Sequence, residues 1–383
     1  MDASAPFVDR NGVPRTPSCS GAPEAVHVGD AVEFVEAPTD YSFFYRDGDP
    51  KKLVIAFDGG GACWDSLTCL SSLIASDKLY NTYVDETVEE LETVGGLVDK
   101  ENPENPISDY MQVFIPYCTG DLHIGSKDTL YEIDTPAGTV SATIHHRGYD
   151  NVVAVLEWID DYYKSVIGAP PEEVLVLGAS AGGYGAFYGY PAIDEMLPAS
   201  TRKRVLIDSA NAIVNQDFYD RALTTNGVWG IWENMPPQLA NAFAAGPDTL
   251  SVAINQDLGW NYPLTRFGQY TRAFDTVQIL YLHIAKNLHN PAAWTNPWSL
   301  LWTTMEWTLK ARISMETSAS TTPNYRYYLG EGFEHTTVAD PSVYLDDSGS
   351  GIRLIDWIDD MLSGRFLFGS DWRNATCYPN CVP

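Results

Sequence analysis

Short apolar runs alternate with helical patterns along most of the chain. Continuous apolar runs that end in turn residues are typical of buried parallel strands. Such runs occur at residues 53–57, 113–116, 174–177 and 205–207. Apolar positions with helical spacing occur at residues 152–166, 183–197 and 276–286. The alternation predicts an α/β fold with a mostly parallel central sheet flanked by helices.

Other segments extend this pattern toward both ends of the chain. Residues 31–35 and 41–45 alternate between apolar and polar side chains, which predicts an antiparallel hairpin or edge strands that open the sheet. Residues 325–329 predict a last strand and residues 352–362 a closing helix. We see no internal repeat or domain linker, so we expect a single domain over residues 1–383.

Two tryptophan-rich segments, residues 218–262 and 288–320, do not fit the rhythm of the predicted strands. Together they hold seven of the eleven tryptophans. We predict that both are helical, cap-like insertions over one end of the sheet. Their aromatic side chains could stack against sugar rings or line an acyl cleft, and they could equally form the core of a small cap.

Composition narrows the classes of partner. Apolar residues make up 45% and charged residues 19% of the chain, which is typical of a globular protein. Asp and Glu total 51 against 23 Lys and Arg, and the net charge of −28 repels nucleic acids and anionic lipids. No stretch is long and apolar enough to cross a bilayer. The charge is compatible with adaptation to salt or simply with an acidic secreted protein.

The six cysteines favour disulfides, because their number is even and two pairs lie close in the sequence. A zinc site would need further His or Cys ligands, and the histidines closest to Cys63 and Cys69 are His27 and His123. Disulfides and acidic charge suggest a secreted protein, extracellular or periplasmic. Residues 1–6 lack the features of a signal peptide, so we expect a mature form from which that peptide is absent.

The strongest local motif is Gly-x-Ser-x-Gly centred on Ser180. It lies between the apolar run at residues 174–177 and the helical pattern at residues 183–197. A serine on a tight turn between strand and helix needs small neighbours, because the backbone there is crowded. Its oxygen would stand at the positive end of a helix. The motif therefore predicts Ser180 as a nucleophile, against the simpler interpretation of a glycine-rich turn.

A glycine-rich segment at residues 58–63 directly follows the apolar run at residues 53–57. In α/β-hydrolases, one oxyanion N–H comes from the residue after the nucleophile and another from such a loop. We therefore predict an oxyanion hole formed by Gly60, Gly61 and Ala181. The alternatives are a plain turn or a phosphate-binding loop, although the Lys and Ser/Thr of a P-loop are missing.

The general base should follow Ser180 in the chain. His335 follows the predicted strand at residues 325–329 and lies in a glycine-containing loop, which suits a base. His283 and His289 lie on or beside a predicted helix and are more typical of core or surface histidines. We therefore predict His335 as the base.

The acid that orients the imidazole should lie between Ser180 and His335. The candidates are Asp208, Asp217, Asp248, Asp257 and Asp275. Asp208 ends the predicted strand just after the nucleophile helix, one strand early for the usual acid. Asp275 follows a possible strand at residues 264–270 and could also be only a helix N-cap.

Taken together, these motifs resemble the pectin acetylesterase and Notum family of secreted carboxylesterases, over residues 30 to 365. The segments that carry the resemblance are Phe57–Gly61 with its nearby cysteines, Ile115–Gly125, Gly178–Gly183, Asp208–Ser209, Phe274–Gln278 and Gly332–Thr336.

The resemblance implies an α/β-hydrolase core and a triad of Ser180, Asp275 and His335. It also implies the oxyanion hole already predicted, although Notum has a bulky aromatic in the glycine loop where this chain has Gly61. Among the cysteines, proximity in the sequence favours the pairs Cys63–Cys69 and Cys377–Cys381. That leaves Cys19 to pair with Cys118.

We therefore predict a secreted serine carboxylesterase that needs no metal or organic cofactor and acts on an O-acetyl or other short acyl ester of a polysaccharide. The alternatives are a lipid or polyester hydrolase, and a protein of this fold that binds carbohydrate or lipid without turnover. His145 and His146, beside a predicted helix, are more typical of surface residues than of a metal site. The acidic segments 9–12 and 346–349 are more typical of turns than of calcium loops. The oligomeric state stays open.

Overall fold

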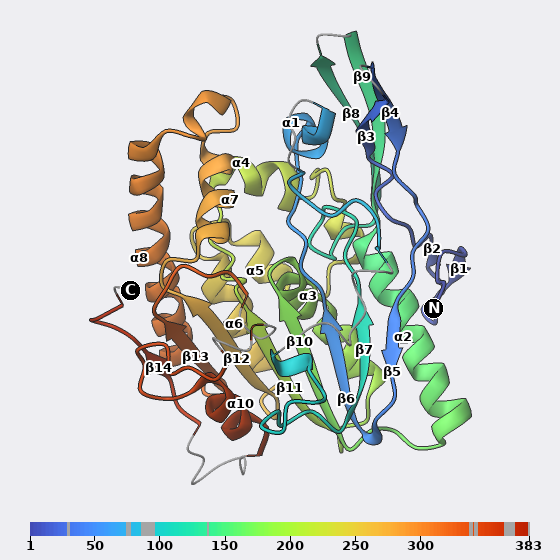
Figure 1. The fold of residues 1–383 in the computed structure, drawn as a ribbon. Helices are drawn as coiled ribbons and strands as arrows, with labels where there is room; N and C mark the ends of the chain where they lie inside the picture. Colours follow the sequence, from blue (N-terminus) through green and yellow to red (C-terminus); the bar gives the residue numbers. More distant parts are fainter. Residues whose placement is uncertain are drawn as a thin grey trace.

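The computed structural model describes residues 1–28, 31–73, 78–85, 96–135, 138–336, 340, 344–363 and 372–381. Within these residues the central sheet has eight strands in the order β14-β13-β12-β11-β10-β6-β7-β5 (Figure 1). In chain order the strands are β5 (Phe44–Arg46), β6 (Asp49–Phe57), β7 (Tyr110–Ile115), β10 (Glu173–Ala179), β11 (Arg202–Asp208), β12 (Arg266–Arg272), β13 (Tyr325–Gly330) and β14 (Ala375–Thr376). All neighbours pair in parallel except β5, which pairs antiparallel with β7.

Helices cover both faces of the sheet, which is why its strands are apolar on both sides. Leu53, Ile55 and Phe57 of β6 pack in one large core with residues of helices α2 (Gly148–Tyr162), α3 (Ala181–Met196) and α6 (Leu250–Asn261). Val54 and Ala56 point to the opposite face and pack with helix α10 (Leu354–Ser363). The predicted α/β class with a mostly parallel sheet is confirmed, and helix α7 (Thr276–Lys286) begins and ends where the sequence predicts.

The N-terminal strands differ from the prediction. Residues 31–35 lie in β4 (Ala31–Glu36), which pairs with β3 (Pro23–Val28) in a separate two-stranded sheet. Of the other predicted segment, Phe44–Arg46 forms the edge strand β5. The two segments therefore have different partners, and the prediction that both open the sheet holds only for the second.

A long hairpin of β8 (Lys127–Thr135) and β9 (Gly138–His146) was not predicted, and it projects at the top of Figure 1. Two further short strands, β1 (Phe7–Val8) and β2 (Pro14–Arg15), also pair with one another. Strands β1 and β2 have two residues each and are too short to give a periodic signal. The nine-residue strand β9 does alternate between more buried and more exposed side chains, and the prediction missed this signal.

The tryptophan-rich segments are helical. The first includes η4 (Tyr219–Leu223), η5 (Ile231–Asn234), α5 (Ala240–Ala244) and α6, and it follows the short helix α4 (Gln216–Phe218). The second contains η6 (Pro291–Ala293) and the 25-residue helix α8 (Pro297–Thr321). Helix α8 packs against α6, α7 and β13, and it runs beside α7 in Figure 1. No helix among the described residues is both long and apolar enough to span a membrane.

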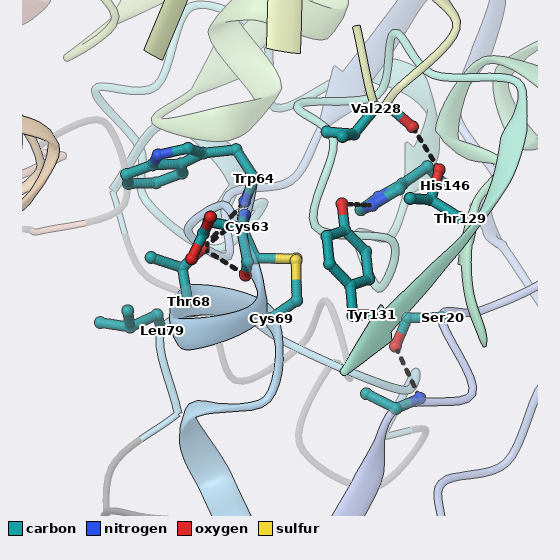
Figure 2. Close-up of a disulfide and its surroundings, with 12 residues drawn as sticks. Ser20, Cys63, Trp64, Thr68, Cys69, Leu79, Thr129, Tyr131, His146 and Val228 are labelled. Atoms are coloured by element: carbon teal, nitrogen blue, oxygen red, sulfur yellow. Dashed lines mark hydrogen bonds between the residues drawn. A yellow bond between two sulfur atoms is a disulfide. The ribbon is translucent and has the colours of Figure 1, made fainter. Parts of the chain in front are cut away.

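Three disulfides join the six cysteines in the pairs that the sequence analysis expects, Cys19–Cys118, Cys63–Cys69 and Cys377–Cys381. The Cys63–Cys69 bond closes the turn of helix α1 (Ser66–Cys69), and the His146 ring lies near it (Figure 2). A metal would need thiolates, and these two sulfurs are bonded to each other. The disulfide instead fixes the conformation of residues 63–69 at the end of the glycine-rich segment.

His146 is fully buried, so the expectation that both neighbouring histidines lie at the surface is wrong for this residue. Its Nδ1 donates to the Thr119 carbonyl oxygen at 2.9 Å. Its Nε2 accepts from the Tyr131 hydroxyl, also at 2.9 Å (Figure 2). His145 is partly exposed and contacts Asp128. Burial lowers the pKa of His146 to about 4, and it does the same for His123.

Replacing His146 with asparagine should make the stability less sensitive to acid. Between pH 6.5 and 4 the unfolded chain binds a proton on this imidazole and the folded chain does not, so His146 lowers stability as pH falls. Burial raises the pKa of Asp121 to about 6, which acts in the opposite direction. Urea unfolding of wild type and His146→Asn from pH 7.5 to 4.5 should therefore show a free-energy difference that shrinks with acid.

The difference isolates His146, because Asp121 and His123 titrate in both proteins. At neutral pH the variant should be less stable by about 1–3 kcal/mol, since a buried hydrogen-bond partner is lost. His145→Asn, at the partly exposed neighbour, serves as the control. A constant difference across the pH range would contradict the prediction for His146.

Candidate active site

Ser180 sits on a strained turn between β10 and α3. Its φ of +53° is rare for a residue with a side chain and costs conformational energy. Crowding explains the glycines around it. A Cβ on Gly178 would lie 2.3 Å from the Gly182 carbonyl oxygen, and one on Gly182 would lie 2.1 Å from the Phe57 carbonyl oxygen. The motif thus lets the turn pack directly against the end of β6.

His335 lies in the loop after β13 and connects Ser180 to Asp275. Its Nε2 is 2.7 Å from Ser180 Oγ, and its Nδ1 is 2.9 Å from each carboxylate oxygen of Asp275. Asp275 is fully buried, whereas His335 is partly open to solvent. Three side chains from distant parts of the chain, up to 155 residues apart in sequence, therefore form one continuous line of hydrogen bonds.

Asp275 is held by the start of helix α7. Its Oδ1 accepts hydrogen bonds from the backbone N–H groups of Val277 and Gln278, and its Oδ2 accepts one from the Gln278 side chain. It is therefore a helix N-cap and the partner of His335 at once. The two interpretations that the sequence left open describe one geometry.

Asp208 ends β11, and its carboxylate accepts a hydrogen bond from Ser209 Oγ at 2.9 Å. The Ser209 oxygen in turn accepts the backbone N–H of Thr336 at 3.1 Å. Asp208 therefore contacts the His335 loop through Ser209, while Asp275 meets the imidazole itself.

The other candidate residues have partners of a different kind. His283 is buried on α7 between Thr303 and the Ala293 carbonyl. His289 is exposed and lies near Arg221. The acidic candidates Asp217 and Asp257 contact Arg221 and the Ala242 backbone N–H, respectively.

The glycine-rich loop lies against Ser180. A Cβ on Gly59 would stand 3.0 Å from the Ser180 Cβ, so the loop backbone passes directly over the serine. Gly61 has a φ of +80°, and a Cβ there would stand 2.1 Å from the Leu79 carbonyl oxygen. In the described part of the chain, the N–H groups of Gly60, Gly61 and Ala181 have no protein acceptor. Gly61 and Ala181 line the same pocket as Ser180, whereas Gly60 is not among its lining residues.

Two residues that the sequence analysis did not assign to the site hold this loop from behind. The Asp58 carboxylate accepts the Gly59 N–H at 2.8 Å, and His123 Nε2 donates to the Asp58 carbonyl oxygen at 2.9 Å. Burial raises the pKa of Asp58 to about 7. His123 also packs edge-on against Phe57. Its position in the Ile115–Gly125 motif was the only signal in the sequence.

An apolar cavity of about 80 Å³ opens beside Ser180. Its walls come from α7, α8 and the segments around α1 and α4, and they include Trp64, Phe218, Tyr281, Leu282 and Trp307. Helix α8 contributes Trp307 to this wall. Trp64 comes from the segment just after Cys63, which the Cys63–Cys69 disulfide holds in place. Part of the aromatic content of the tryptophan-rich segments therefore lines a cleft.

A second, enclosed void of about 10 Å³ lies behind the first. The two cavities share Leu122, Tyr184, Val214 and Phe218 as lining residues. These side chains therefore form the partition between the cavity at Ser180 and a deeper apolar space.

Comparisons with known proteins bear on the family and the fold of the chain. Residues 39–229, about half of the chain, match the family model described as Pectinacetylesterase. The palmitoleoyl-protein carboxylesterase NOTUM of the planarian Schmidtea mediterranea is 28% identical over 160 residues. That match covers 41% of this chain and only 27% of the planarian protein.

Two crystal structures of the Wnt deacylase Notum from Drosophila have a similar fold. They superpose with TM-scores of 0.55 and 0.54 at sequence identities of 18% and 17%. The similarity covers 90% and 94% of this chain, and 89% and 99% of the Drosophila chains. At this level of identity the likeness concerns the fold.

Proposed function

Because the chain belongs to the pectin acetylesterase and Notum family, we propose that it is a serine carboxylesterase with Ser180 as nucleophile, His335 as base and Asp275 as acid. The observation that carries this proposal is the line of hydrogen bonds from Ser180 Oγ through both nitrogens of His335 to Asp275. A serine is a weak nucleophile until an adjacent base takes its proton, and this arrangement supplies that base.

In the proposed mechanism, Ser180 Oγ attacks the ester carbonyl carbon while His335 Nε2 takes the serine proton. Asp275 holds the imidazole in the required tautomer and stabilises its protonated form. The negative charge on the former carbonyl oxygen is stabilised by the N–H groups of Ala181 and Gly61, with Gly60 as a further donor. The alcohol then leaves with the proton from Nε2, and an acyl group remains on Ser180.

A water molecule completes the cycle by the same route. His335 takes its proton, the hydroxide attacks the acyl carbon, and the proton returns to Ser180 as the acid leaves. Every atom of the substrate and the water is accounted for in the alcohol and acid products. These steps use only the side chains and backbone groups of this chain.

The acyl group would lie in the apolar cavity beside Ser180. The cavity has a volume of only about 80 Å³. That size fits an acetyl or another short acyl group, and it favours O-acetylated or short-acylated polysaccharide over a long-chain lipid. A net charge of −28 favours neutral, acylated polymer over a polyanion unless salt screens the repulsion. Three disulfides support an extracellular or periplasmic location.

The test of this proposal is hydrolysis of p-nitrophenyl acetate, butyrate and octanoate, together with acetate release from an acetylated polysaccharide. We expect kcat/KM to be highest for the acetate or butyrate ester and lower for octanoate. Absence of turnover on every ester and on the polysaccharide would favour the alternative of a binding protein without catalysis. A maximum at octanoate would favour the lipid or polyester alternative.

Phe218→Ala should move the preference toward longer acyl chains. Phe218 is part of the partition between the two cavities, so its removal joins them. Each methylene that becomes buried contributes about 0.8 kcal/mol, so the octanoate-to-acetate ratio of kcat/KM should rise by at least about tenfold. Phe187→Ala is a matched control, because Phe187 lines only the deeper void. An unchanged ratio in Phe218→Ala would show that the acyl chain takes another path.

A further inference from the structure

Helix α8 exposes a continuous apolar face to solvent. Trp298 is 73% exposed, Trp302 68% and Met305 57%, and Leu301, Leu309 and Ile313 are each about half exposed. Their spacing of three or four residues places all six on one side of the helix. In Figure 1 this helix forms the outer edge of the molecule. Single exposed apolar residues are normal, but a contiguous stripe of this size marks an interaction site.

The opposite side of α8 is buried in its own chain. Trp307, Ala311 and Met315 are almost fully inaccessible, and Trp307 lines the cavity beside Ser180. Apolar residues therefore occupy both sides of the helix. A helix that is apolar all round is typical of one that is buried all round. The side of α8 that carries Trp298, Trp302 and Met305 is therefore suited to burial, although this chain leaves it exposed to solvent.

Charge on α8 is sparse and balanced. Glu306 is paired with Lys310 and with Lys286 of α7, at the edge of the apolar face. Arg312 lies over the Tyr378 ring at 4.1 Å, and Glu316 completes the charged residues of the helix. The helix is thus neutral in a chain of net charge −28. Exposed Trp and Met with few charges are typical of the centre of a protein interface.

We propose that this face binds the same face of a second copy of the chain, with the two α8 helices antiparallel across a twofold axis near Met305. Trp298 lies about 10.5 Å from Met305 along the helix and Ile313 about 12 Å on the other side. An axis at Met305 therefore places Trp298 opposite Ile313 and Trp302 opposite Leu309. Such an interface is self-complementary, as twofold symmetry requires.

The available area is sufficient for a stable dimer. The six side chains present on the order of 700 Å² to solvent. Pairing would bury about 1,400 Å² in total, within the range of roughly 1,200–2,000 Å² for stable interfaces. A membrane-binding helix would instead present a polar face rich in Lys and Arg, and the side of α8 opposite the apolar stripe is packed against protein.

Dimerisation would support the pocket wall, because α8 contributes Trp307 to it. The second copy would bind in the same way whether or not the chain is an esterase, so the two proposals can be tested separately.

Analytical ultracentrifugation from the micromolar to the hundred-micromolar range tests the dimer. We expect the wild type to sediment with twice the monomer mass, and more completely in high salt, because screening weakens the repulsion between two acidic chains. Met305→Glu should be monomeric, since two like charges would meet at the axis. Leu130→Glu is the matched control, because Leu130 is 63% exposed on β8, and it should remain dimeric.

A cysteine at the axis gives a second test that does not depend on weakening the interface. All six native cysteines are in disulfides, so Met305→Cys introduces the free thiol. It should form a covalent dimer on mild oxidation. Trp298→Cys should not, because the two copies of residue 298 would lie about 21 Å apart along the direction of the helices.

A wild type that stays monomeric at all concentrations and salts, with no crosslinking of Met305→Cys, would overturn the proposal. Binding of a monomeric wild type to neutral phosphatidylcholine vesicles, lost in Trp302→Ala, would overturn it in favour of a lipid surface. A dimer that persists in Met305→Glu would also overturn it, since the interface would lie elsewhere.

Discussion

Replacing Ser180 with alanine should lower kcat for p-nitrophenyl acetate by about 10⁴- to 10⁶-fold. The change removes the atom that forms the bond to the acyl carbon, so no other group of the site can replace it. Residual hydrolysis would come from the oxyanion donors and from binding. The fold should tolerate the change, because alanine meets the same strain at a φ of +53° as serine does.

The measurement is a comparison of initial rates with thermal unfolding of the same preparations. A fluorophosphonate probe adds an independent readout, since it should label the wild type at Ser180 and leave the variant unlabelled. Ser314→Ala serves as the control, because Ser314 is buried on α8 and bonds only to the helix backbone. Full activity in Ser180→Ala would contradict the assignment of the nucleophile.

The parts of the site that were predictable are those with local signals. A buried strand, a crowded turn and a helix around Ser180 are all encoded within about ten residues. The strand that precedes His335 is equally local, because β13 is a short run of mostly buried aromatic and apolar residues. The α/β class followed for the same reason.

The parts that were not predictable depend on long-range packing. The order of β11, β12 and β13 in the sheet determines which strand end lies next to His335. From chain order alone, Asp208 and Asp275 both remained candidates for the acid. His146 is buried because the β8–β9 hairpin packs near the Cys63–Cys69 disulfide. That disulfide was predicted, but its proximity to His146 depends on the fold. The support of the glycine loop by His123 arises from a contact 65 residues apart.

The tryptophans of α8 illustrate the same limit. Their segment is predicted to be helical, yet the sequence does not show that Trp307 faces the cavity while Trp298 and Trp302 face solvent. Apolar residues on both sides remove the periodicity that normally identifies the buried face.

Asp275→Asn should lower kcat by about 10⁴-fold while leaving the fold nearly as stable as the wild type. Asparagine is a good N-cap, so the start of α7 keeps the hydrogen bonds to Val277 and Gln278. Its amide, however, can donate to His335 Nδ1 and so favour the tautomer that carries its hydrogen on Nε2. That tautomer cannot accept the serine proton, and no negative charge would stabilise the imidazolium.

Asp208→Asn is the matched control, because it makes the same chemical change at the other buried carboxylate near the His335 loop. Its amide oxygen can still accept from Ser209 Oγ, so the loop should stay in place and kcat should fall by only about tenfold or less. Rates and unfolding midpoints of the two variants separate chemistry from stability. The assignment of Asp275 as the acid rests on its direct contact with His335 Nδ1, whereas the carboxylate of Asp208 contacts Ser209. If Asp208→Asn lost as much kcat as Asp275→Asn at unchanged stability, the acid would have to be reassigned.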